Sequence, residues 1–181
     1  MERELEVKVL GMDLDELEDK VKDLGGKLIA KELQENTLID SKDKPIKSYL
    51  DGYLRVRETK DLLDNKVNVN LTLKKNINLD GLRDNIELNA KVEDKEMMIK
   101  ILDELGFNNI EIGHKERKSY RLKEARIDFD KWDERTYPFP YLEIEVKDRK
   151  HLNEIITLLE IPQENISTKS IVELRNELEL L

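Results

Sequence analysis

Short segments in which polar and apolar residues alternate recur along the chain. In residues 4–9 (ELEVKV) the alternation places Glu4, Glu6 and Lys8 on one face of a strand, and only leucine and valine on the other. The same period of two predicts further strands at 27–32, 36–40, 53–58, 67–74, 84–92, 115–122, 125–130 and 141–147.

Apolar residues spaced three and four apart predict four helices between these strands. The first helix begins after Asp13, a residue suited to cap a helix N-terminus, and ends at Gly25. Its apolar positions are Leu14, Leu17, Val21 and Leu24. The others are predicted at 97–105, at 152–159 and from near Ser167 toward the C-terminus.

This order of elements predicts an α+β fold in a single domain, residues 1–181, with eight or nine mostly antiparallel strands. The amphipathic helices need an apolar sheet surface to cover, so the charged strand faces must look away from them. An open sheet would leave those charges in water. A sheet that closes on itself would instead line an internal channel with them. The pattern alone leaves both arrangements open.

Composition narrows the classes of function. Charged residues make up 40% of the chain, and the formal net charge of −9 disfavours nonspecific binding to nucleic acid. A local basic site is still compatible with 32 lysines and arginines. The absence of cysteine excludes thiolate catalysis and cysteine-based zinc sites. The two histidines lie far apart and form no ligand-spaced motif.

Nothing in the sequence indicates a membrane or an export signal. The first twenty residues are rich in Asp and Glu, unlike a signal or transit peptide. No apolar run approaches the roughly 18 residues of a transmembrane helix. We therefore expect a cytoplasmic protein without membrane or nucleic-acid partners; a homodimer is left open.

The charges on the strand faces are paired by kind. Arg55 and Arg57 occupy one face of a strand, and glutamates recur at the same spacing at Glu4 and Glu6 and again at Glu143 and Glu145. Neighbouring like charges repel, so each pair favours a counter-ion between its members. Arginines suit phosphate oxygens, and carboxylates suit Mg²⁺ or Mn²⁺. A site with both suits a metal-bound polyphosphate.

At these positions the chain resembles the CYTH superfamily, the triphosphate tunnel metalloenzymes. The resemblance spans the whole chain, with the motifs in the family's order. The matching residues are Glu4, Glu6 and Lys8; Arg55 and Arg57; Lys74; Glu87; Lys115 and Arg117; Asp130, with Asp128 as its competitor; Glu143 and Glu145; and, loosely, Lys169.

The resemblance implies a closed eight-stranded antiparallel β-barrel with helices packed outside, whose tunnel binds a triphosphate and Mg²⁺ or Mn²⁺. The triphosphate would be bound by Lys8, Arg55, Arg57, Lys74, Lys115, Arg117 and Lys169. The metal ligands would be Glu4, Glu6, Glu143 and Glu145. Lys8, Glu87 and Asp130 would have catalytic roles.

Three functions follow from this resemblance. The first is a metal-dependent hydrolase of inorganic tripolyphosphate or a small organic triphosphate. The second is a class IV adenylate cyclase, which converts ATP to cyclic AMP and pyrophosphate. Cyclases of this branch usually carry a His-Phe pair before the first glutamate motif, where this chain has Met1, Glu2 and Arg3, although residues 34–40 resemble a stretch common in cyclase-like members. The third is a noncatalytic polyphosphate- or nucleotide-binding module.

Overall fold

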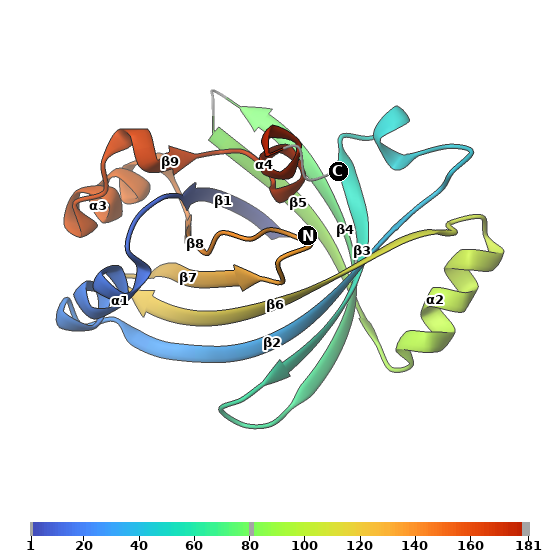
Figure 1. The fold of residues 1–181 in the computed structure, drawn as a ribbon, viewed down its shortest axis with the longest axis horizontal. Helices are drawn as coiled ribbons and strands as arrows, with labels where there is room; N and C mark the ends of the chain where they lie inside the picture. The colour runs from blue at the N-terminus through green and yellow to red at the C-terminus, as the bar shows by residue number, and fades with distance from the viewer. Residues whose placement is uncertain (1, 80–81, 179–181) are drawn as a thin grey trace.

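The computed structural model describes the backbone of residues 2–79 and 82–178 and the side chains of residues 5–75 and 85–178. A strongly curved sheet dominates the structure, and its helices lie on the convex side or at the ends (Figure 1). The strands are β1 (Glu2–Val9), β2 (Lys27–Asp40), β3 (Gly52–Asp61), β4 (Val67–Leu79), β5 (Leu82–Val92), β6 (Asn109–Leu122), β7 (Ala125–Trp132), β8 (Tyr141–Val146) and β9 (Ile166–Ser167). The helices are α1 (Leu14–Asp23), α2 (Lys95–Glu104), α3 (Arg149–Leu159) and α4 (Ile171–Glu177).

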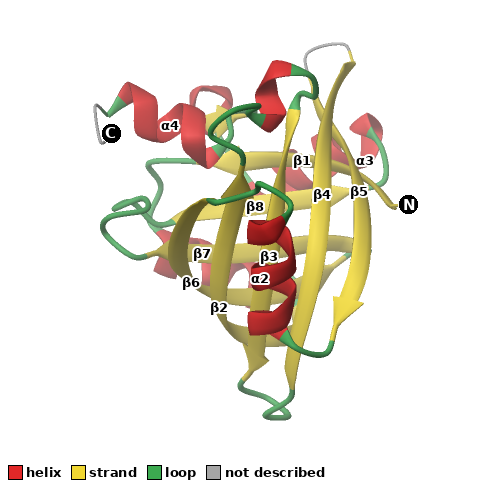
Figure 2. Cartoon of the chain, turned by 90° about the vertical axis from the view of Figure 1, so that its right-hand side faces the viewer, coloured by secondary structure: helices red, strands yellow, loops and turns green. Residues whose placement is uncertain are grey.

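The strands form one antiparallel sheet in the order β5-β4-β3-β2-β6-β7-β8-β1-β9. The first strand, β1, also pairs with β5, through residues 2–6 against 83–87. Its pairing with β8 runs from Leu5 to Val9, and β9 adds two residues beside Lys8 and Val9. Figure 2 shows the resulting wall of strands, with α2 across its outer face. The predicted α+β class and antiparallel sheet are confirmed.

The apolar strand faces carry the main core beneath two helices. Val7, Val9 and Ile144 of the sheet pack with Val21 of α1 and Ile155 of α3, and all five are at most 1% exposed. A smaller cluster joins α2 to Ile39 and Val56. Burial of these residues is the largest source of stability available to the fold. The expectation that the helices cover the Leu/Ile/Val side is confirmed for α1, α2 and α3, whereas α4 lies at one end of the cavity.

The opposite, charged strand faces are buried rather than solvated. Lys8, Lys74, Lys115, Asp128 and Asp130 are each at most 5% exposed. These side chains therefore face an interior rather than open water, which is consistent with a tunnel-like fold. The strand order does not by itself show a closed barrel, so closure stays a prediction.

Element boundaries differ from expectation at several places; for example, β4 extends to Leu79 and β6 begins at Asn109. The predicted strands at 27–32 and 36–40 form the single strand β2, which has a register shift between Leu28 and Ala30. The last helix begins at Ile171 rather than near Ser167, because Ser170 and Glu173 form a capping box. The first helix begins as predicted, with the Asp13 side chain accepting hydrogen bonds from the backbone N–H groups of Asp15 and Glu16. Among the described helices, none is long and apolar enough to cross a bilayer.

Candidate functional site

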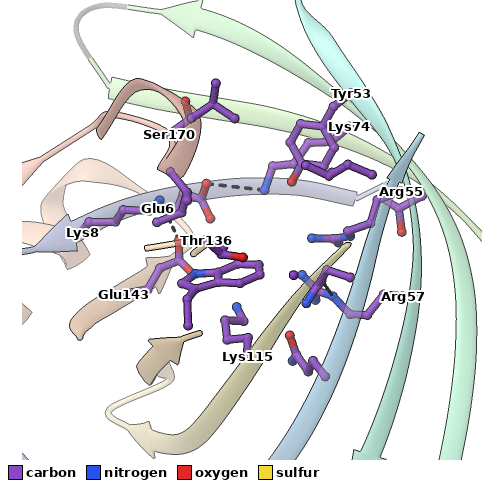
Figure 3. Close-up of a pocket in the computed structure, with 18 of the residues that line it drawn as sticks. Glu6, Lys8, Tyr53, Arg55, Arg57, Lys74, Lys115, Thr136, Glu143 and Ser170 are labelled. Carbon is purple, nitrogen blue, oxygen red and sulfur yellow. Dashed lines mark hydrogen bonds and ion pairs between the residues drawn. The ribbon is translucent and has the colours of Figure 1, made fainter. Parts of the chain in front are cut away.

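The inward faces of the strands surround a cavity of about 780 Å³. Its lining includes charged side chains from β1 and from β3 to β8, together with residues 168–173 and 175 at one end. Figure 3 shows side chains that project into this space from β1, β3, β4 and β6: Lys8, Arg55, Arg57, Lys74 and Lys115. Residues far apart in the sequence are thus brought to one enclosed site, as the resemblance implied.

Two arginines of β3 face the cavity without carboxylate partners. Within the described part of the chain, neither Arg55 nor Arg57 forms an ion pair, and the Nε atom of Arg55 is buried without a hydrogen bond. Arg57 donates from Nε to Oδ1 of Asn36 at 2.7 Å. Burial, with Arg55 and Arg117 nearby, lowers the pKa of Arg57 to about 9. An anionic ligand would relieve both the desolvation and the repulsion.

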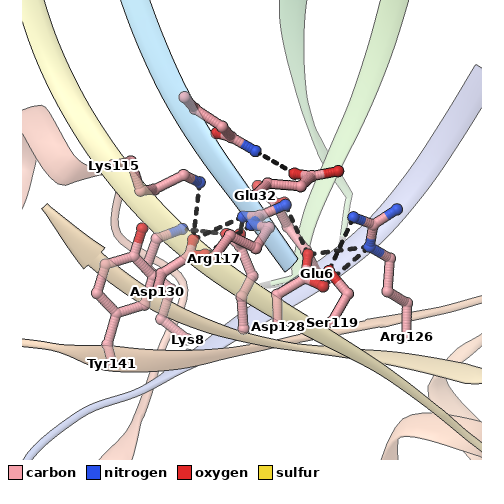
Figure 4. A network of polar contacts seen from close by, with 12 residues as sticks. Glu6, Lys8, Glu32, Lys115, Arg117, Ser119, Arg126, Asp128, Asp130 and Tyr141 are labelled. Carbon is pink, nitrogen blue, oxygen red and sulfur yellow. Dashed lines mark hydrogen bonds and ion pairs between the residues drawn. The ribbon is translucent and has the colours of Figure 1, made fainter. Parts of the chain in front are cut away.

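On β6 the cations are held by acids from β7 and β8 (Figure 4). Arg117 donates to both carboxylate oxygens of Asp130, each at 2.6 Å, and reaches Asp128 at 2.6 Å and Glu143 at 2.8 Å. Although burial opposes it, attraction to Asp128 and Asp130 raises the pKa of Arg117. Asp128 is among the residues that line the cavity, whereas Asp130 is not and instead binds Arg117 and Lys115. Which of the two is the acid of the site stays a prediction.

Lys115 lies beside this network, but acidic groups neutralise its positive charge less fully than that of Arg117. Its Nζ donates to Oδ2 of Asp130 at 2.8 Å. Burial and the adjacent Arg117 and Arg57 outweigh the attraction of Asp130 and Glu143, and lower the pKa of Lys115 to about 7. A lysine in this state takes up a proton when an anion binds near it.

The remaining predicted lysines pair with glutamates. Lys8 donates to Glu143 at 2.9 Å. Lys74 lies 3.1 Å from Glu87 and 3.4 Å from Glu6. Burial raises the pKa of Glu87, but Lys74 and Arg55 more than offset it, so the net shift is downward. Both lysines thus have carboxylates that fix their positions within the cavity.

Carboxylates gather where β1 meets β8. Glu6 stands opposite Glu145, and Lys8 opposite Glu143. Burial, with Asp128, Glu6 and Glu143 adding to it, raises the pKa of Glu145 against the attraction of Arg126. Glu145 forms no hydrogen bond or ion pair with a described residue. The Glu4 side chain lies outside the described residues, although its backbone belongs to β1.

The metal prediction rests on this acidic cluster, defined as Glu6, Glu143 and Glu145. Across the side chains that the structure describes, no three acidic or histidine residues form a set arranged to hold a metal ion. The donor chemistry still fits Mg²⁺ or Mn²⁺, because all three groups are carboxylates, and the like charges around Glu145, together with burial, outweigh the attraction of Arg126. The metal ligands therefore stay a prediction.

Lys169 differs from the other predicted phosphate-binding residues. It lies at the cavity rim, its side chain is 49% exposed, and its Nζ pairs with Glu177 of α4. The other predicted cations of the cavity are buried, except that Arg57 is half-buried. Those on β3, β4 and β6 are called the cation cluster below: Arg55, Arg57, Lys74, Lys115 and Arg117.

Sequence reasoning missed several lining residues. Arg126 binds Asp128 at 2.9 Å and Ser119 at 3.1 Å. Its position two residues before Asp128 on one strand face was the available signal. Trp132 and Tyr141 also line the cavity. So do uncharged hydrogen-bonding side chains of β2 to β5: Gln34, Asn36, Thr59, Asn70, Thr72 and Asn89.

Comparisons with known proteins agree with this geometry. A family model described as the CYTH domain matches residues 2–173. A protein of Methanocaldococcus jannaschii, named "Putative adenylate cyclase MJ0240", is 30% identical over 181 residues, which cover 95% of this chain and 98% of the relative.

Solved structures share the fold at lower identity. The PH1012 protein from Pyrococcus horikoshii has a TM-score of 0.76 at 23% identity, covering 94% of this chain and 98% of its own. A Hippeastrum protein has a TM-score of 0.62 at 15% identity, covering 94% of this chain and 91% of its own. Its structure is described as "Putative adenylyl cyclase HpAC1 from Hippeastrum reveals a dominant triphophatase activity".

Proposed function

Because this chain belongs to the CYTH family, we propose that it is a metal-dependent hydrolase that binds a triphosphate in its charged cavity. One observation carries the proposal: Arg55, which is buried, and Arg57, which is half-buried, line the cavity from one strand without an ion pair among the described residues, and Lys115 lines the same cavity. Buried unpaired cations are costly, and a polyanion is the ligand that compensates several at once.

Closure of the sheet is part of this proposal. The pairing of β1 with both β5 and β8 gives each of the strands β1 to β8 two neighbours. We propose that these eight strands act as a closed barrel around the triphosphate. Such a wall would limit water around the charges and so strengthen every electrostatic interaction with the substrate.

The residues of the cavity would have different roles in phosphoryl transfer. The cation cluster would bind the phosphate oxygens and neutralise charge that develops in the transition state. Asp130 would keep Lys115 and Arg117 in position, and Glu87 would do the same for Lys74. Lys8 would bind the terminal phosphate that is attacked. Water would add to that phosphorus as the bond to the bridging oxygen breaks, so that the diphosphate part departs and the attacked group becomes free phosphate. The proton that water loses would pass to a phosphate oxygen.

Mg²⁺ or Mn²⁺ is part of the proposed reaction. The residues that would hold it are Glu6, Glu143 and Glu145, with Glu4 of the same strand. When bound, the ion would supply further neutralisation of the triphosphate oxygens. Its presence would also remove the repulsion that raises the pKa of Glu145.

A second candidate is an adenylate cyclase, because the Methanocaldococcus jannaschii relative bears that name at 30% identity. The same cations would bind ATP, with its ribose 3′ oxygen as nucleophile in place of water. The Hippeastrum protein is named as a cyclase, but the description of its structure reports a dominant triphosphatase activity. This supports the hydrolase as the first candidate. A noncatalytic binding module is the third candidate.

One experiment separates the three. The pure protein is incubated with tripolyphosphate, ATP or thiamine triphosphate, with Mg²⁺ or Mn²⁺, and phosphate, pyrophosphate and cyclic AMP are measured. We expect metal-dependent release of phosphate. Cyclic AMP with pyrophosphate would select the cyclase, and binding without any product would select the module. Arg121→Met, at an exposed position outside the cavity, is the control for Arg55→Met, which should abolish turnover.

A further inference from the structure

Aromatic residues are scarce in this chain, yet Trp132 lines the cavity directly beside the cation cluster. Trp132 is the single tryptophan of the sequence. It stands opposite Lys115 of the neighbouring strand β6. The Nζ atom of Lys115 lies 5.2 Å from the centroid of the Trp132 ring. A flat group attached to a phosphate bound at Lys115 would therefore meet this ring.

The site of the tryptophan ring is built by its neighbours. Gly113 of β6 has no side chain, and a Cβ atom there would lie 3.2 Å from Cζ3 of Trp132 and 2.5 Å from Oγ1 of Thr136. The indole Nε1 donates to the Tyr141 hydroxyl at 3.0 Å, which fixes the orientation of the ring. Trp132 stays partly exposed while Tyr141 is 2% exposed. The indole is thus held in place with surface still available to a ligand.

Two amides on β2 lie next to this site and have unused hydrogen-bonding atoms. Asn36 stands opposite Gly113, and Gln34 opposite Lys115. Oε1 of Gln34 and Nδ2 of Asn36 are buried without a partner among the described residues. Both side chains line the cavity and are at most 3% exposed.

Charged neighbours fix which atom each amide presents. Gln34 donates from Nε2 to Glu32 at 2.5 Å, so its carbonyl oxygen is left as an acceptor. Asn36 accepts from Arg57 through Oδ1, so its NH₂ group is left as a donor. Buried polar groups without partners are unfavourable. Together the two atoms match a ligand edge that carries one donor and one acceptor.

We propose that this end of the cavity binds an aromatic heterocycle attached to the triphosphate, with Trp132 stacking on the ring and Gln34 and Asn36 bonding its edge. Nucleobases have this combination of a flat face and an edge with donor and acceptor atoms. The inference rests on the proposed triphosphate site and names its substrate class as a nucleoside triphosphate rather than bare tripolyphosphate.

The single tryptophan makes the test direct. Its fluorescence is titrated with ATP, methyl triphosphate and tripolyphosphate, in EDTA and again with Ca²⁺ in place of Mg²⁺, while calorimetry measures binding of each. We expect ATP to change the emission strongly, the two ringless compounds to change it little, and tripolyphosphate to reverse the change by competition. ATP that binds without a larger change than methyl triphosphate would overturn the inference.

Variants separate ring contact from a structural effect. Trp132→Leu should weaken ATP binding about tenfold and leave tripolyphosphate binding within about twofold, whereas Trp132→Phe should restore most of the ATP affinity. Gln34→Met should likewise weaken ATP alone. Phe139→Leu, at an exposed aromatic residue outside the cavity, is the control. Equal losses for ATP and tripolyphosphate in Trp132→Leu would refute ring recognition, and failure of every triphosphate to bind the wild type would refute the proposed function itself.

Discussion

Glu6 and Glu145 face each other directly across the β1–β8 pair, inside the cavity. Two like charges opposite one another on adjacent strands destabilise a sheet. Nearby Asp128 and Glu143 add to the effect and, with burial, raise the pKa of Glu145. A cation bound between these carboxylates would offset their repulsion, and this is the reason to expect a metal ion at this position.

Glu145→Gln tests this relationship. In EDTA the variant should be more stable than the wild type by about 1 kcal/mol, because one repelling charge is removed. Added Mg²⁺ or Mn²⁺ should raise the melting temperature of the wild type and have little effect on the variant. Thermal unfolding with and without metal provides the measurement. Glu116→Gln, on the exposed face of β6, is the control, and an equal metal-induced shift in Glu145→Gln would show that this carboxylate is not a ligand.

Replacing Arg55 should have opposite effects on the binding of tripolyphosphate and on the stability of the unliganded protein. Arg55→Met removes a buried cation that has no ion pair among the described residues, so the unliganded protein should become more stable. Tripolyphosphate binding should weaken ten- to a hundredfold, the range expected for a lost hydrogen bond to a charged group. Calorimetry and denaturant unfolding measure the two effects. A variant that loses stability and keeps its affinity would contradict the assigned role of Arg55.

Lys115 should make triphosphate binding depend on pH. Its pKa in the free protein is about 7, and a bound polyanion should raise it. Above pH 7, binding must then take up a proton, so affinity should fall as pH rises. The groups that set this pKa are Arg117 on its own strand and Arg57, Asp130 and Glu143 on others.

Calorimetry in buffers of different ionisation enthalpy measures the proton uptake. Lys115→Arg keeps the charge and should remove both the uptake and the pH dependence between 7 and 9. The same pKa predicts a stability effect without ligand. In the unfolded chain Lys115 has its ordinary pKa of 10.5. Between pH 7 and 10.5 the unfolded state therefore binds more protons than the folded state. The contribution of Lys115 to the free energy of unfolding rises with pH over this range. Unchanged proton uptake in Lys115→Arg would assign the titration to another group.

Asp130→Asn should destabilise the fold, in contrast to Glu145→Gln. Asp130 is 1% exposed and binds both Lys115 and Arg117. Removing one member of a buried ion-pair network leaves an uncompensated charge, at a cost of about 3 kcal/mol. Denaturant unfolding of both variants measures the sign of the change in the free energy of unfolding. If the two isosteric changes shifted stability in the same direction, the distinction between a paired and an unpaired carboxylate would fail.

The sequence predicted the strand faces well because a period of two leaves no ambiguity about which residues share a face. Arg55 with Arg57, and Lys115 with Arg117, lie on inward faces as alternation required. It could not predict the opposition of Glu6 and Glu145, because strand register depends on pairing across the sheet.

The β2 amides were missed for a different reason. The outward face of this strand also carries polar residues, including Glu35, which pairs with Lys95 of α2. With polar side chains on both faces, the alternation that marks a strand is lost, and a register shift near Leu28 obscures it further. The alternation therefore did not distinguish Gln34 and Asn36 from surface residues, and the resemblance of residues 34–40 to cyclase-like members assigned no role to either.

The position of β1 has a consequence for how the chain folds during synthesis. This strand forms its hydrogen bonds with residues 83–87, 142–146 and 166–167. It can therefore complete its pairing only after segments far along the sequence have been made. Contacts between residues so distant in sequence make folding slow. Until then β1 would be an incompletely paired, half-apolar strand, the kind of segment that chaperones shield.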